Sequence, residues 1–199
     1  MLTGKKIVLG VSGGIAAYKM ANVASMLSKL HADIHVVMTE NATHFITPET
    51  FEVLTGNHCY TDTFDRCMEL HVPHIALGTQ ADAILIAPAS ADVVGKIANG
   101  IADDMLTTCV LPATCPVMLA PSMNVHMYEN PIVQDNMKKL VSYGYEIIEA
   151  DEGYLACRDI GKGKLPPEHV LVDYIIRACA MDKDLAGKKV LVTAGATQE

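Results

Sequence analysis

Short apolar segments alternate with helical segments along the first 150 residues, and this alternation restricts the possible fold more than any other feature. Five segments have the composition of buried strands, because Val, Ile and Leu occupy consecutive positions in them. They are Ile7–Val11, Ile34–Met38, Ala83–Ala87, Val117–Ala120 and Glu146–Ile148. Strands that are apolar on both sides and separated by helices form a parallel sheet. The sequence therefore predicts an α/β fold, a doubly wound, Rossmann-like or flavodoxin-like parallel sheet with helices on both faces.

Helical periodicity identifies the segments between the strands. In the first helix, which is expected to begin at Ile15, the residues Val23, Leu27 and Leu30 form an apolar stripe. A further helix is expected to start near Pro73. The remaining predicted helices are Pro48–Leu54, Ala91–Asn99, Asp103–Val110, Pro131–Tyr143, which Gly144 should end, and Glu168–Met181.

Composition excludes several classes of function. The chain has 199 residues, enough for one domain and a fragment of a second, and a formal net charge of −8, which argues against nucleic acid or an anionic membrane as partner. Its apolar runs are shorter than the ~20 residues of a membrane span. No secretory signal is recognisable, and the six cysteines contain no CxxC pair, so we expect reduced thiols and a cytoplasmic location. Pro73 interrupts the HxxH pair His71 and His74, and no metal site is expected.

Four polar turns follow four of the predicted strands. "SGG" follows the first strand, "MTENATHF" the second, "APASADV" the third and "APSMNVHMY" the fourth. Parallel strands end at the same edge of a sheet, and ligands of such sheets bind beyond that edge, near the switch point in strand order. The convergence of these turns predicts a binding site there.

The turn at Ser12, Gly13 and Gly14 has the character of a phosphate site. Its glycines do not match GxGxxG, so the dinucleotide fingerprint fails. A glycine turn that opens a helix still offers backbone N–H groups and the positive helix end to a phosphate. Ser90 repeats the arrangement as a possible helix cap. A tight turn and a plain N-cap without any ligand remain the structural alternatives.

Three further residues are candidates for chemistry. His74 stands at a predicted helix start, Asn124 in a polar break after a buried strand, and Cys157 in a polar segment close to Arg158 and Lys164. Nearby cations lower the pKa of a thiol. Each residue also has a structural alternative: a histidine bonded to backbone, an asparagine that folds a turn, or a packing cysteine. The residues alone predict an α/β enzyme that binds a phosphate-bearing cofactor, with these three at its site.

The character of the sequence changes at residue 150. The segment "ADEGYLACRDIGKGKLPPEH" is glycine-rich, charged and without periodicity, which is typical of a functional or disordered loop. After the last predicted helix, "DLAGKKVLVTAGATQE" begins again as a strand and a glycine turn, similar to the opening "GKKIVLGVSGG".

Four motifs, "SGGIAAYK", "PASADV" with "GKIANGIADDMLTT", "APSMNVHMY" and "LACRDIGKGK", occur in this order between residues 7 and 180. Together they resemble the flavin-containing cysteine decarboxylases, and among these the bacterial phosphopantothenoylcysteine decarboxylases. The tail is similar to the start of the phosphopantothenate–cysteine ligase domain that follows the decarboxylase in many bacteria. The resemblance implies a decarboxylase domain over 1–181 with a substrate flap over 151–166. Residues 182–199 would be a linker and the first strand of a truncated ligase domain, with ligase activity only in a longer chain.

The resemblance implies that the phosphate belongs to FMN. His74 corresponds to the family's active-site histidine, Asn124 to the asparagine that binds the substrate carboxylate, and Cys157 to the flap cysteine that donates a proton. By position, the FMN contacts would be Ser12, Gly13, Gly14, Ile15, Thr39, Ser90, Ala91, Asp92, Val93 and Ser122. The chain departs from the family pattern at four positions. Asp92 stands where some members have Asn, and Tyr128 is the aromatic residue that ends the asparagine motif. Arg158 takes the place of a glycine, and Gln80 the place of a frequent Trp.

The implied reaction is the FMN-dependent decarboxylation of 4′-phosphopantothenoylcysteine to 4′-phosphopantetheine in coenzyme A biosynthesis. The substrate thiol would be oxidised to a thioaldehyde that accepts the electrons released with CO2, and the resulting enethiolate would be reduced again. The resemblance also implies a homotrimer that assembles into a homododecamer, with FMN between subunits. A flavin prenyltransferase and a non-catalytic regulatory flavoprotein are the alternatives. The motifs of Asn124 and Cys157 favour the decarboxylase over the prenyltransferase. The presence of all three candidate residues, His74, Asn124 and Cys157, argues against the regulatory protein, whose members typically lack one of them.

Overall fold

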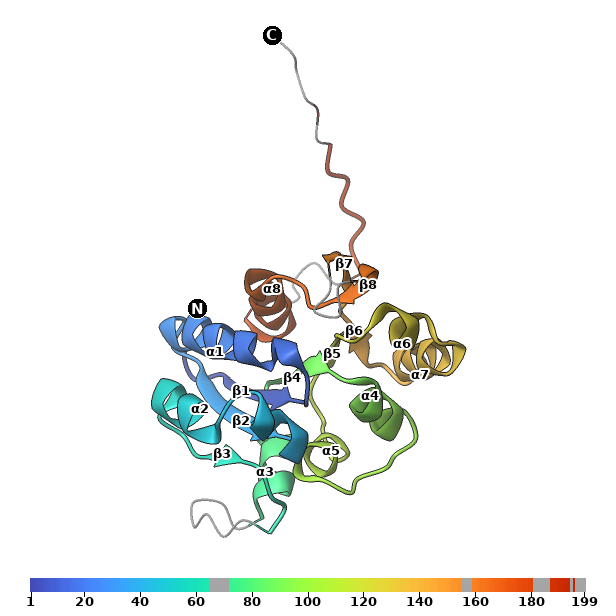
Figure 1. Cartoon of the computed structure of the whole chain (residues 1–199). Helices are drawn as coiled ribbons and strands as arrows, with labels where there is room; N and C mark the ends of the chain where they lie inside the picture. Colours follow the sequence, from blue (N-terminus) through green and yellow to red (C-terminus); the bar gives the residue numbers. More distant parts are fainter. Residues whose placement is uncertain (65–71, 155–158, 181–186, 194, 196–199) are drawn as a thin grey trace.

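The computed structural model describes residues 1–64, 72–154, 159–180, 187–193 and 195. Its centre is a six-stranded parallel sheet with the order β3-β2-β1-β4-β5-β6 (Figure 1). The strands are β1 Lys6–Val11, β2 Asp33–Met38, β3 Cys59–Tyr60, β4 Ala83–Ala89, β5 Val117–Pro121 and β6 Glu146–Ile147. The five predicted strands are confirmed, and the order is that of a Rossmann fold rather than of flavodoxin.

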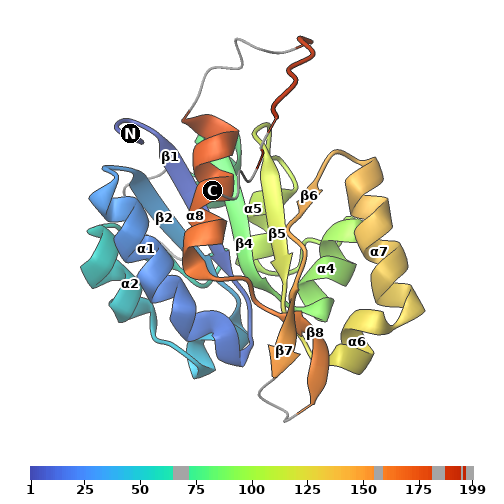
Figure 2. The same cartoon turned by 90° about the horizontal axis from the view of Figure 1, so that it is seen from above.

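Helices cover both faces of the sheet. One layer contains α1 (Met20–Lys29), α2 (Pro48–Thr55) and α8 (Glu168–Cys179), and the other α3 (Pro73–Gln80), α4 (Ala91–Ala98), α5 (Met105–Val110) and α7 (Pro131–Ser142). Two 3₁₀-helices, η1 (Ile15–Lys19) and η2 (Glu40–His44), and the short helix α6 (Val125–Glu129) follow strands at one edge of the sheet. Figure 2 shows the sheet between these layers.

The alternation of side chains along the strands builds two separate cores. On β1, Leu9 and Val11 point into the core beneath α1, α2 and α8, whereas Val8 points into the core beneath the other helices. All three are at most 1% exposed. Because both faces of each central strand are buried, these strands read as continuous apolar runs in the sequence, as a parallel sheet requires.

Burial also explains two of the cysteines. Cys59 and Cys109 lie in the cores, and burial raises the pKa of each thiol to about 12. Such thiols stay protonated at neutral pH and behave as small apolar side chains.

The helix boundaries differ slightly from the prediction. The first helical segment begins as the 3₁₀-helix η1, in which the Ala17 N–H donates to the Gly14 carbonyl, three residues back. Helix α5 starts at Met105, since Asp104 is its N-cap: the Asp104 carboxylate accepts the Thr107 N–H at 2.8 Å, and the Thr107 hydroxyl closes a capping box. Helix α7 ends as predicted, with Gly144 at φ +91° just beyond its C-cap.

The segment after residue 150 contains regular structure, which corrects the expectation of a loop without it. Strands β7 (Asp151–Tyr154) and β8 (Ile160–Lys164) form an antiparallel pair beyond the carboxyl ends of β4 and β5 (Figure 2). Most of their residues are exposed or half-buried, so no alternation of apolar and polar residues marks them in the sequence.

The expected strand within 182–199 is not formed in the described part of that segment. Residues 187–193 contain no strand and are exposed. A strand needs a neighbour for its backbone N–H and C=O groups, and within the described residues none pairs with this segment. No helix in the described part of the chain is long and apolar enough to cross a lipid bilayer.

Candidate functional site

The candidate site lies at the switch point of the sheet, where β1 and β4 are adjacent and their connections leave in opposite directions. Ser12, the first residue after β1, is fully buried there. Its hydroxyl donates to the Pro88 carbonyl at 2.7 Å and accepts the Ser90 N–H at 2.9 Å. Ser12 therefore joins the turns after β1 and β4. Its hydroxyl is bonded within the protein, and Ser12 does not line the cavity described below. The contact with the cofactor that was predicted for Ser12 stays a prediction.

The glycine turn after β1 is held by close packing. A Cβ atom on Gly13 would lie 2.6 Å from the Cβ of Asn41, in the segment after β2. Only glycine fits this approach without displacing that segment. The turn leads directly into η1, whose first backbone N–H groups have no partner within the helix. This is the local geometry of an anion site.

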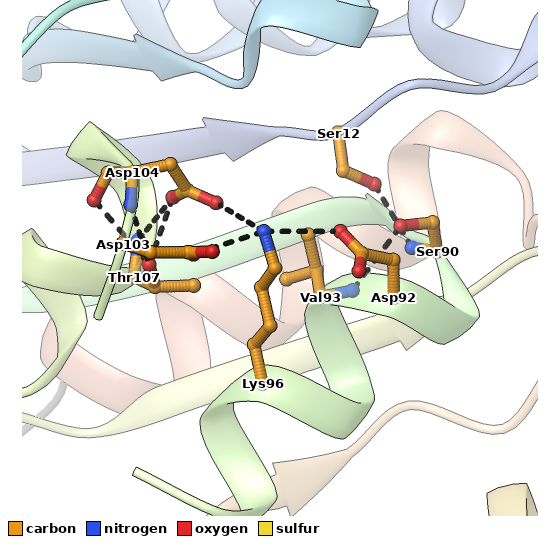
Figure 3. Close-up of polar contacts among 8 residues, drawn as sticks. All are labelled: Ser12, Ser90, Asp92, Val93, Lys96, Asp103, Asp104 and Thr107. Carbon is orange, nitrogen blue, oxygen red and sulfur yellow. Dashed lines mark hydrogen bonds and ion pairs between the residues drawn. The ribbon is translucent and has the colours of Figure 1, made fainter. Parts of the chain in front are cut away.

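The turn after β4 is fixed by the cap of α4. The Ser90 hydroxyl accepts the Val93 N–H at 3.3 Å, as the sequence predicted for an N-cap. The cofactor contact predicted for Asp92 stays a prediction. The Asp92 carboxylate lies 3.4 Å from the Lys96 ammonium, together with Asp103 at 2.9 Å and Asp104 at 3.1 Å (Figure 3). The ion cluster attaches α4 to the start of α5.

The turn after β5 positions Asn124. Its side-chain oxygen accepts the His126 N–H at 2.9 Å and caps α6. Its amide nitrogen donates to the Asp159 carboxylate at 3.0 Å, just before β8. The Ser122 N–H donates to the Ala89 carbonyl at 3.1 Å, so the turns after β4 and β5 are also joined.

Strand β8 is docked on this same turn. The Met123 N–H donates to the Gly163 carbonyl at 3.0 Å, and α6 contacts β8. Gly163 has φ +142°, and a Cβ there would collide with the Met123 carbonyl oxygen. The glycines of "GKGK" thus allow the β7–β8 hairpin to approach the site closely.

These elements enclose a cavity of about 490 Å³, within the range of small-molecule sites. Seven of the residues predicted for the site line it: Gly13, Gly14, Ile15, Ser90, Ala91, Ser122 and Asn124. Its apolar lining includes large side chains that are otherwise exposed, such as Ile15 at 59% and Tyr18 at 55%. An apolar space with a few polar groups at one end suits a flat aromatic ring that carries a phosphate.

Other predicted residues do not line this cavity. Val93 is buried in the core, and Thr39 follows β2, two residues from Asn41. His74 is the second residue of α3. Cys157 and Arg158 lie outside the described residues. Two of these side chains carry a buried atom without a hydrogen-bond partner in the described part of the chain, the Thr39 hydroxyl and the His74 Nδ1. A buried polar atom without a partner costs about 1–3 kcal/mol, and such atoms at this edge fit residues that contact a ligand.

Sequence reasoning missed several residues of the cavity. Tyr18, Lys19 and Met127 fall inside the quoted motifs, but their spacing from the turns gave no sign that they would face the same space. Tyr154 and Lys164 come from the hairpin that was expected to be irregular. Among the described residues, no cluster of His, Cys, Asp or Glu is arranged to hold a metal.

The residues present fit FMN. The glycine turn, the first turn of η1 and the Ser90 cap supply neutral donors for a phosphate, and the apolar lining suits the ring. The glycine pattern still lacks the GxGxxG of a dinucleotide site.

The comparisons agree with this geometry. The model of the family described as Flavoprotein matches residues 1–180. The coenzyme A biosynthesis bifunctional protein CoaBC of Bacillus subtilis is 47% identical over 201 residues, which cover all of this chain and 50% of that protein. The chain thus spans about half the length of this curated relative.

Two solved structures share the fold. A PPC decarboxylase, as a cysteine-to-serine variant complexed with pantothenoylaminoethenethiol, is 29% identical with a TM-score of 0.77 over 86% of this chain and 96% of that one. The FMN-dependent cysteine decarboxylase SpaF is 34% identical with a TM-score of 0.75 over 88% of this chain and 99% of that one.

Proposed function

The chain belongs to the flavoprotein family, and on that premise we propose that it decarboxylates 4′-phosphopantothenoylcysteine to 4′-phosphopantetheine with FMN, in coenzyme A biosynthesis. The observation that carries the proposal is the cavity at the switch point, where the glycine turn after β1, the Ser90 cap and Asn124 surround one space. The similarity to CoaBC, a coenzyme A biosynthesis protein, supports the pathway, and the similarity to SpaF, an FMN-dependent cysteine decarboxylase, supports the reaction class. The cytoplasm is the proposed location, and ligase activity is proposed only for a longer chain.

FMN, when bound, would supply the reversible two-electron oxidation of the substrate thiol that makes loss of CO2 possible. Asn124 would hold the reacting carboxylate through its amide N–H, which now donates to Asp159. A neutral donor orients a carboxylate without the strong stabilisation that a cation would give it, so the carboxylate can still leave as CO2.

His74 and Cys157 would handle the protons. An imidazole exchanges protons near neutral pH, so His74 would orient or deprotonate the substrate thiol. Cys157, in the segment that joins β7 to β8, would donate a proton to the enethiolate, so that the return of the two electrons taken from the substrate could give the thiol product. The apolar lining from Ile15 and Met127 would keep water away from these steps.

We also propose that the active site is completed between copies of the chain, in homotrimers that assemble into a homododecamer. His74 does not line the cavity of its own chain. Beside it, Val72 and Ile75 are 43% and 44% exposed and form an apolar surface. A neighbouring copy that covered this surface would bring its cavity to His74. Mixing inactive His74→Asn chains with inactive Asn124→Asp chains should then restore activity, and sedimentation should show trimers or their multiples. A monomer that turns over substrate would contradict this arrangement.

The proposed cofactor is tested on the purified chain. The absorption spectrum should show a bound flavin, and the mass of the released cofactor should be that of FMN. FAD or a nicotinamide dinucleotide would contradict the proposal. Incubation with 4′-phosphopantothenoylcysteine should yield CO2 and 4′-phosphopantetheine, whereas a prenylated flavin formed from a prenyl donor would assign the chain to the flavin prenyltransferases.

A further inference from the structure

Two lysines line the cavity, and neither has a carboxylate partner among the described residues. Lys19 is the last residue of η1, and Lys164 is the last residue of β8. No described Asp or Glu lines the cavity, although the whole chain has 23 acidic and 15 basic residues and Asp159 lies next to the lining residue Asn124. The two lysines are therefore the charged residues of the cavity lining, and they would attract an anion.

Several other lysines of the described surface are paired with carboxylates. Lys5 lies 3.0 Å from the Asp82 carboxylate, Lys162 lies 2.9 Å from Glu149, and Lys96 contacts three aspartates. These pairs neutralise each cation within the fold. Lys19 and Lys164 instead line one cavity without an ion pair among the described residues, and two such cations suit a phosphate or carboxylate ligand.

The other anions of the proposed reaction already have donors. The FMN phosphate has neutral donors at the glycine turn and at the Ser90 cap, and the substrate carboxylate has Asn124. Lys164 follows Gly163, whose carbonyl accepts the Met123 N–H beside Asn124, so it belongs to the same cavity. The 4′-phosphate is the one anion of the proposed reaction to which no described residue has been assigned.

Given the proposed function, on which this inference rests, we propose that Lys19 and Lys164 bind the 4′-phosphate of the substrate. The pair would make the enzyme prefer 4′-phosphopantothenoylcysteine to pantothenoylcysteine, which has the same reacting end without the phosphate. Lys19 belongs to the turn that holds the cofactor, and Lys164 belongs to the hairpin. A substrate bound by both would therefore also fix the hairpin over the cavity.

The test compares kcat/KM for the two substrates, at saturating FMN, in the full chain and in the Lys19→Gln and Lys164→Gln variants. A hydrogen bond between charged groups contributes enough for each variant to lower the ratio of the two kcat/KM values about tenfold to a hundredfold. Lys164→Arg, which keeps the charge, should retain most of the preference. Lys29→Gln removes an exposed lysine at the end of α1, which does not line the cavity, and should change neither value.

Each other result overturns the inference in a recognisable way. If a variant has a higher Kd for FMN while the ratio of the two kcat/KM values at saturating FMN is unchanged, the lysines hold the cofactor instead. If the ratio is unchanged while FMN stays bound and the melting temperature is that of the wild type, the lysines do not recognise the phosphate. A wild-type chain with bound FMN that decarboxylates neither substrate would refute the proposed function itself.

Discussion

The amide nitrogen of Asn124 donates a hydrogen bond of 3.0 Å to the carboxylate of Asp159, where the β7–β8 hairpin meets the turn after β5. The proposed reaction needs the same amide for the carboxylate of the substrate. A substrate that takes this donor leaves its own negative charge close to that of Asp159. Because CO2 is neutral, this repulsion would be relieved as the reaction proceeds.

Asp159→Asn should therefore lower KM and kcat together, each by about twofold to fivefold as is typical of exposed charge pairs, with little change in kcat/KM. Steady-state kinetics with 4′-phosphopantothenoylcysteine measure both constants. A rise in KM would show instead that Asp159 helps to hold the substrate or the hairpin.

Ser12→Ala should weaken both the fold and cofactor binding. The change leaves the Ser90 N–H without its acceptor and removes both side-chain hydrogen bonds of Ser12 between the turns after β1 and β4. We expect a loss of about 1–3 kcal/mol in the free energy of unfolding and a higher Kd for FMN. Urea unfolding and flavin fluorescence titration measure these quantities. Ser28→Ala, at an exposed position of α1, is the matched control, and equal effects of the two changes would remove the special role of Ser12.

Lys96→Met should destabilise the protein by about 1–3 kcal/mol at neutral pH, because it leaves three aspartates side by side without a cation. The hydrogen bond to Asp103 raises the pKa of the Lys96 ammonium above its usual value. Partial burial opposes this rise, and the charges of Asp104 and Asp92 add to it. Because the pKa of Lys96 is higher in the folded state, its ion pairs stabilise the fold fully at any pH below the pKa of lysine in the unfolded chain, about 10.4. This stabilisation is lost as the pH rises through the pKa of Lys96 in the folded protein.

The stability difference between wild type and Lys96→Met should thus be constant from pH 7 to about pH 10 and should shrink at higher pH. Urea unfolding across this range measures it. If the difference in free energy of unfolding grew above pH 10, the charged Lys96 ammonium would not be the group that stabilises the cluster. Lys138→Met, which removes a lysine exposed on α7, should have little effect at any pH.

Cys157→Ser should allow oxidation and loss of CO2 but slow the final protonation. A serine hydroxyl is a much weaker acid than a thiol, whose ordinary pKa is about 8.5. Reduced flavin and an oxidised, decarboxylated product should then accumulate, seen as bleaching of the flavin band after one turnover. Near-normal multiple turnover by this variant would assign Cys157 a packing role only.

The main elements of the sheet and the turns of the site were predictable because local sequence carries them. Buried strands such as Val117–Pro121 appear as continuous apolar runs, and Asn124 follows one of these directly. Strand β3 was missed because two residues cannot show a periodicity. The hairpin was missed because its strands are mostly exposed and therefore lack an apolar face.

The unpredicted parts of the site depend on tertiary packing. The ion cluster of Asp92 with Lys96 and the start of α5 has no signal in the local sequence, because packing of α4 against α5 forms it. Lys19 and Lys164 are 145 positions apart, and only the docking of β8 on the turn after β5 brings them to one cavity. Cys157 lies outside the described residues, and its role at the site stays a prediction.

The central claim is tested most directly by counting the CO2 released from 4′-phosphopantothenoylcysteine labelled at the cysteine carboxyl. The FMN-loaded chain should release one labelled CO2 for each 4′-phosphopantetheine formed, over many turnovers and without added oxidant. His74→Asn should keep its flavin and release none. Labelled substrate that is recovered unchanged from the FMN-loaded wild-type chain would contradict the account.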